Sequence, residues 1–198
     1  MTTESDAIVW NSELPLELYA AMGRVAHATA LLDAMLGEFA EYLTDSTSTW
    51  VFVSGQSTDW LIQTCRVLLE TTLDPQRTRY PDEFHEAVRQ QLSRASDLRN
   101  LRNRVIHGTW SNASFAEDPL QRPWGDTTSE RTFWVARDRQ RRSFEEQAMT
   151  AGDVNRLADE IDLVTDGVIR AWRSVTPHRP DWPPFRRWHD LGLNSSEV

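Results

Sequence analysis

Four stretches of the chain repeat apolar residues every three or four positions, with polar residues between them. The first begins at Pro15 and runs to about Thr44. Comparable patterns cover residues 58–72, 81–107 and 150–175. This spacing places the apolar side chains on one face of an α-helix, and packing then buries that face. The sequence therefore predicts four long helices whose apolar faces meet in one core.

Start and stop signals support the predicted helix ends. Pro81 precedes two acids at the start of the third helix, where proline fits and negative charge is favourable. Thr150 and Asp153, three positions apart, form a capping-box-like start for the last helix. Gly108 is a natural stop. We expect the third helix to end at about His107.

Two short strands are predicted between the third and last helices. Residues 132–136 and 143–149 are the strand candidates, and residues 138–141 would turn between them. The expected hairpin therefore occupies about residues 130–149. Its aromatic pair, Phe133 and Trp134, either stacks on RNA or packs against the bundle, and packing is the interpretation that we favour.

Two other stretches are less clear. Residues 110–115 are a candidate for a third strand, and Trp50–Val53 is an apolar insert that forms a strand or a packed loop. The expected fold class is mainly α: about four long helices in residues 1–175, with a small β-hairpin inserted before the last helix. Residues 176–198 form a tail with four prolines and three large aromatics. Since disordered segments are poor in aromatics, we expect this tail to dock on the bundle or on a second subunit.

Composition narrows the functional class. All 21 basic residues are arginine, and the formal net charge is −9. An acidic protein is not a general nucleic-acid binder, so any RNA contact must be local. The single cysteine, Cys65, excludes an internal disulfide and lies in an apolar pattern typical of a buried thiol. No signal peptide and no membrane-spanning run is visible, so we expect a cytoplasmic protein with no membrane partner.

The end of the third predicted helix carries the candidate chemistry. Arg102 and His107 are separated by four residues, and Asn103 follows the arginine. A histidine moves protons near neutral pH, and an arginine matches phosphate oxygens with a rigid fork of donors. This pair suits metal-free cleavage of an RNA phosphodiester. Arg99 and Arg104 on the same helix are candidates for substrate binding.

The geometry of that pair is awkward on a helix. Asn103 and His107 are four apart and share a face, so Asn103 could orient the imidazole. Arg102 and His107 are five apart, which is about 140° around an ideal helix. They converge only if the arginine side chain sweeps round, the last turn opens, or a second subunit completes the site.

The stretch RNRVIHGTW at the end of a long helix resembles the HEPN superfamily (higher eukaryotes and prokaryotes nucleotide-binding), whose signature is R-x(4–6)-H. The resemblance covers Arg102, Asn103 and His107 closely, and the helical order of residues 15–175 loosely. It implies a HEPN-like helical bundle, usually dimeric, and a metal-independent endoribonuclease that acts as a toxin, a phage-defence effector or an RNA-processing factor. One departure is Thr109, where family members controlled by nucleotide addition often carry tyrosine.

The resemblance implies a mechanism and partners. His107 would act as general acid or base, Arg102 would stabilise the phosphorane, and Asn103 would orient the imidazole or phosphate. RNA is the expected substrate, and a homodimer would place the site at its interface. An antitoxin or regulatory protein is a further partner that the resemblance suggests. We expect no metal and no cofactor, because no metal-ligand spacing, P-loop or dinucleotide motif is present.

Two alternatives stay open. The bundle could be a non-catalytic dimeric module that binds RNA, a nucleotide or a protein through the same surface. It could also be a structural helical domain in which Arg102 pairs with an acid such as Asp33 or Glu38. The position of Arg102 and the exposure of His107 discriminate between them.

Overall fold

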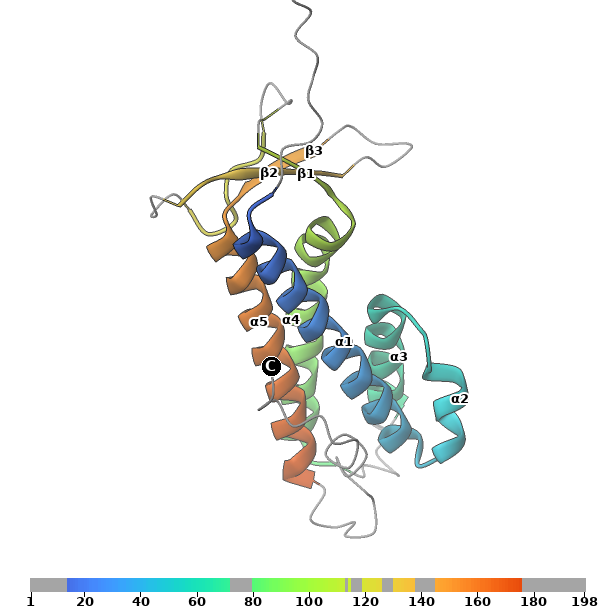
Figure 1. Cartoon of the computed structure of the whole chain (residues 1–198). Coiled ribbons are helices and arrows are strands. Elements are labelled where there is room, and N and C mark those ends of the chain that lie inside the picture. Colours follow the sequence, from blue (N-terminus) through green and yellow to red (C-terminus); the bar gives the residue numbers. More distant parts are fainter. Residues whose placement is uncertain are drawn as a thin grey trace, which may run out of the picture.

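The computed structural model describes residues 14–71, 80–112, 114, 119–125, 130–137 and 145–175. Four long helices dominate these residues (Figure 1): α1 (Leu16–Thr44), α3 (Thr58–Thr71), α4 (Asp82–His107) and α5 (Ala151–Val175). Three strands form one antiparallel sheet: β1 (Thr109–Ser111), β2 (Phe133–Arg137) and β3 (Glu145–Met149). The predicted class, mainly α with a hairpin before the last helix, is confirmed. The predicted 138–141 turn and the 176–198 tail lie outside the described residues.

The core forms where α1, α4 and α5 pack side by side. α1 lies along α5, α4 packs against α5, and α3 contacts α1 and α4 (Figure 1). The residues that α1 buries recur every three or four positions, as its sequence pattern predicts. Its fully buried members include Leu18, Val25, Met35, Leu36 and Phe39. Cys65 is also buried in this core, which confirms the expected inert position.

One end of the bundle is closed by an aromatic cluster. The Tyr80 and Phe84 rings have centroids 4.9 Å apart, and Trp172 lies 5.5 Å from Tyr42 and 6.3 Å from Phe39. Offset and edge-to-face contacts of this kind add to the stabilisation from burial alone. The cluster joins the ends of α1 and α5 to the start of α4.

The sheet lies at the opposite end of the bundle (Figure 1). β2 is its central strand, with Trp110 paired to Val135 on one side and Phe133 paired to Met149 on the other. Phe133, Val135 and Met149 are buried, so Phe133 packs on the bundle as we favoured, whereas Trp134 is only half-buried. The third strand is present, but it is shorter than residues 110–115 and begins at Thr109.

The segment Trp50–Val53 is a one-turn helix, α2, and neither a strand nor a loop. The Ser54 N–H donates to the Trp50 carbonyl at 3.0 Å, which satisfies the backbone locally. No strand among the described residues pairs with it, and an isolated strand is unstable in water. Val53 is buried beside Gly37 of α1, whereas residues 50–52 are exposed.

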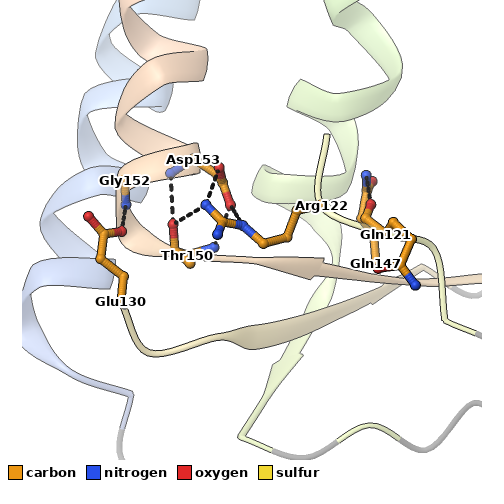
Figure 2. Close-up of polar contacts among 7 residues, drawn as sticks. All are labelled: Gln121, Arg122, Glu130, Gln147, Thr150, Gly152 and Asp153. Carbon is orange, nitrogen blue, oxygen red and sulfur yellow. Dashed lines mark hydrogen bonds and ion pairs between the residues drawn. The ribbon is translucent and has the colours of Figure 1, made fainter. Parts of the chain in front are cut away.

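A buried ion pair fixes the start of α5 (Figure 2). The Arg122 guanidinium donates to both carboxylate oxygens of Asp153, at 2.7 and 2.9 Å, and both side chains are less than a tenth exposed. Thr150 and Asp153 also exchange the two bonds of the predicted capping box, at 2.9 and 3.1 Å. The Gly152 N–H donates to Glu130 at 3.0 Å. These bonds tie the 119–125 segment and the end of β3 to α5.

The described residues contain no helix that is both long and apolar enough to cross a membrane.

Replacing Gly108 with alanine should destabilise the protein. A Cβ at this position would lie 2.4 Å from the Arg104 carbonyl oxygen and 2.5 Å from the Val135 side chain. Overpacking of this kind costs about 1–3 kcal/mol, which urea denaturation would measure. Gly23→Ala is the matched control, because nothing lies within 4 Å of a Cβ there. That control should gain about 0.5–1 kcal/mol from helix propensity. Equal effects of the two changes would contradict the close contact at Gly108.

Removing the Arg122 side chain should cost far more than removing an exposed arginine. Arg122→Ala leaves the buried Asp153 carboxylate without its cation, a loss of about 3–5 kcal/mol. Arg89→Ala breaks the exposed Arg89–Glu86 pair and should cost less than about 1 kcal/mol. Thermal unfolding of both variants beside the parent protein would measure the difference. A small effect at Arg122 would mean that the pair is not buried in solution.

Candidate functional site

The last two turns of α4 carry the predicted motif. The helix is unbroken from Asp82 to His107, and the Gly108 N–H donates to the Arg104 carbonyl at 2.8 Å. Gly108 therefore terminates the helix where the sequence predicted. Arg102 and Asn103 are partly buried, and His107 is exposed.

Arg102 lies close enough to Asp33 of α1 for their charges to interact. Asp33 also accepts a hydrogen bond from Thr58, the first residue of α3. Burial raises the pKa of Asp33, and the Thr58 hydrogen bond and the charge of Arg102 offset only part of this effect. Asp33 is one of the two acids that the sequence suggested as a partner for Arg102.

Arg99 joins the same polar cluster. Its guanidinium lies 3.6 Å from the Asp59 carboxylate of α3, and the charge of Asp59 in turn acts on Asp33. One buried oxygen of Asp33 and one of Asp59 have no hydrogen-bond partner among the described residues. The junction of α1, α3 and α4 therefore gathers two carboxylates and two guanidinium groups.

Arg104 has a structural role. Its guanidinium donates to Glu145 at 2.9 Å and to the side-chain oxygen of Gln147, and only 14% of its side chain is exposed. Gln147 in turn donates to the Gln121 carbonyl at 3.2 Å. Arg104 thus holds β3 and the 119–125 segment against α4, whereas Arg99 stays near the surface.

The intact helix separates Arg102 from His107. Because the last turn does not open, the two positions remain about 140° apart around the helix. Arg102 interacts with Asp33 toward the bundle, while His107 is exposed at the helix end. Asn103 lies one turn before His107 on the same face. Arg102 and His107 could therefore meet one substrate only if the arginine side chain reorients or a second subunit completes the site.

Sequence reasoning missed the interactions that hold this region in place. Asp153 was visible as a capping residue, but its ion-pair partner Arg122 lies 31 positions earlier in an irregular segment. Nothing in the local pattern of Arg104 distinguished it from Arg99. The roles of Arg122 and Arg104 both depend on contacts between residues that are far apart in the sequence.

The residues that the structure describes include no group of three or more histidine, cysteine or acidic side chains placed to hold a metal ion. Comparisons of the chain with protein-family models, with curated proteins and with solved structures find no match.

Asp33→Asn should change the pH dependence of stability in a defined direction. The raised pKa means that the folded protein binds a proton at Asp33 more tightly than the unfolded chain does. The parent protein therefore loses stability as the pH rises from the ordinary carboxyl pKa of 3.8 through the higher pKa that Asp33 has in the folded protein. The asparagine variant lacks this loss, so it should be at least as stable as the parent protein at pH 7. The two stabilities should converge in acid.

Denaturant unfolding from pH 3 to pH 7 would test this expectation, with the exposed Asp97→Asn as the control. A variant that is clearly less stable than the parent protein at pH 7 would show that attraction to Arg102 outweighs the burial of Asp33.

Proposed function

We propose that this chain is a metal-independent endoribonuclease of the HEPN type. The observation that carries the proposal is the Arg102-Asn103-x3-His107 motif at the end of α4, with the imidazole exposed to solvent. A proton-transfer group must reach its substrate, and His107 satisfies that condition. Arg102 precedes His107 by five residues on the same helix, with Asn103 between them.

The reaction needs two proton transfers and no metal. The RNA 2′-hydroxyl loses its proton to a base and attacks the adjacent phosphorus, and the bond to the 5′-oxygen breaks as that oxygen gains a proton. The products are a cyclic phosphate and a 5′-hydroxyl. His107 performs a proton transfer, Arg102 stabilises the charge on the phosphorane, and Asn103 orients the imidazole or the phosphate.

A homodimer completes the proposed site. Arg102 and His107 diverge on one helix, so two motifs facing each other across a two-fold axis would let one substrate meet groups from both chains. RNA binding would be local, through Arg99, since the protein as a whole is acidic. Arg104, the other arginine predicted to bind substrate, is bonded to Glu145 and Gln147. Such an enzyme would act in the cytoplasm as a toxin or phage-defence effector, under an antitoxin or another regulatory protein.

A second candidate is a non-catalytic HEPN module that binds RNA, a nucleotide or a protein partner. The observation that favours it is the placement of Arg102 beside Asp33. A neighbouring carboxylate weakens the positive charge that Arg102 offers to a phosphorane, so this surface suits ligand binding better than catalysis.

Cleavage of RNA by purified protein in EDTA would decide between the two. The parent protein should release fragments with cyclic-phosphate ends, and His107→Ala and Arg102→Ala should each slow cleavage about 10²-fold or more. His27→Ala and Arg89→Ala change exposed residues of the same types elsewhere, so they should cleave like the parent protein.

Two results would contradict the enzyme proposal. Cleavage that survives in His107→Ala would point to a contaminating nuclease. Absence of cleavage, together with RNA binding that Arg102→Ala abolishes, would assign the binding module.

A further inference from the structure

Five large apolar side chains of α2 and α3 are exposed. Val51 is 75% exposed and Phe52 is 67% exposed, with Trp50 beside them. Trp60 and Val67 of α3 are also exposed. Clusters of this kind commonly mark a binding surface. We call these five residues the α2–α3 surface.

The α3 part of this surface is hollowed and carries no charged group. The hollow has a volume of about 260 Å³ and is lined by Trp60, Gln63, Thr64, Val67 and Leu68. Because the lining is apolar or neutral, it suits an apolar side chain better than a charged ligand. An aromatic ring is the chemical group that such a hollow accommodates best.

The sequence contains a segment with matching chemistry. Residues 179–188, RPDWPPFRRW, place Trp182, Phe185 and Trp188 three positions apart among prolines. Prolines favour the polyproline II conformation, whose three residues per turn would align these rings on one edge, about 9 Å apart. Proline-rich segments of this form bind aromatic-lined grooves.

The end of α5, from which that segment continues, lies at the same end of the bundle as α2. Trp172, three residues before the helix ends at Val175, contacts Tyr42 near the end of α1. α2 follows α1 at that same end of the bundle (Figure 1). α1 contacts both α5 and α3, so the axes of α5 and α3 are separated by about two interhelical spacings of 8–10 Å each. Seven residues from Val175 to Trp182 span up to about 25 Å, which is enough to cross that distance.

The charges of residues 38–71 and of residues 179–188 are complementary. From residue 38 to residue 71 the chain carries five acids and the single arginine Arg66. Residues 179–188 carry three arginines and one acid. Electrostatic attraction would therefore orient the segment toward this side of the bundle and not toward the arginine-bearing α4.

We propose that residues 179–188 of the same chain cover the α2–α3 surface, with their aromatic side chains against Trp60 and the neighbouring apolar residues. This interaction is independent of the proposed ribonuclease activity. It assigns one occupant to the exposed apolar residues of α2 and α3.

Thiol labelling of the full chain tests the proposal. Gln63→Cys places a thiol in the hollow, and native Cys65 should stay silent because it is buried and burial raises its pKa to about 12. The labelling rate with a maleimide is compared with and without the triple change Trp182→Ser, Phe185→Ser and Trp188→Ser. We expect labelling to be about tenfold faster without the aromatics, at any protein concentration.

Ser93→Cys, on the exposed side of α4, is the matched control and should label equally in both backgrounds if the tail substitutions leave the fold intact. Three results would overturn the proposal. Fast labelling of the Gln63→Cys variant in both backgrounds would mean that the surface is uncovered. Protection that ignores the aromatics and grows with protein concentration would assign the surface to a second copy. Protection that needs the aromatics and grows with concentration would assign it to the tail of a second copy.

Discussion

The contact between the end of α4 and the sheet constrains most of the structure around the candidate site. Gly108 approaches the Arg104 carbonyl and Val135 so closely that no side chain fits there. The helix ends at His107, and β1 begins at Thr109, directly after Gly108. The end of α4 beside the imidazole and the close approach of β2 both depend on the absence of a side chain at residue 108.

Polar networks then hold the sheet in that position. Arg104 connects α4 to β3, and Gln147 extends the connection to the 119–125 segment. Arg122 and Asp153 connect that segment to α5 through a pair that is almost fully buried. Because the charges of Arg122 and Asp153 are matched and hydrogen-bonded, this pair can lie in an interior that would otherwise exclude it.

The candidate site lies beside acidic residues of α1 and α3. Asp33 and Asp59 place negative charge next to Arg102 and Arg99, at the junction of α1, α3 and α4. A phosphate must therefore compete with two carboxylates for the same guanidinium groups. A protein that is acidic overall would then bind nucleic acid only where a second subunit or a reoriented arginine shifts that balance.

Elements that depend on local pattern could be located from the amino-acid order alone. Helical spacing, Pro81, Gly108 and the Thr150–Asp153 cap located the long helices to within a residue or two, because these signals act within one turn. Packing in three dimensions was needed for the rest. It made Trp50–Val53 a helical turn, gave Arg104 and Arg122 their partners, and placed Arg102 beside Asp33. The partners of Arg102, Arg104 and Arg122 lie tens of positions away in the sequence. Burial also changes the energy of a charge or an apolar surface, and a short stretch of sequence does not show which residues are buried.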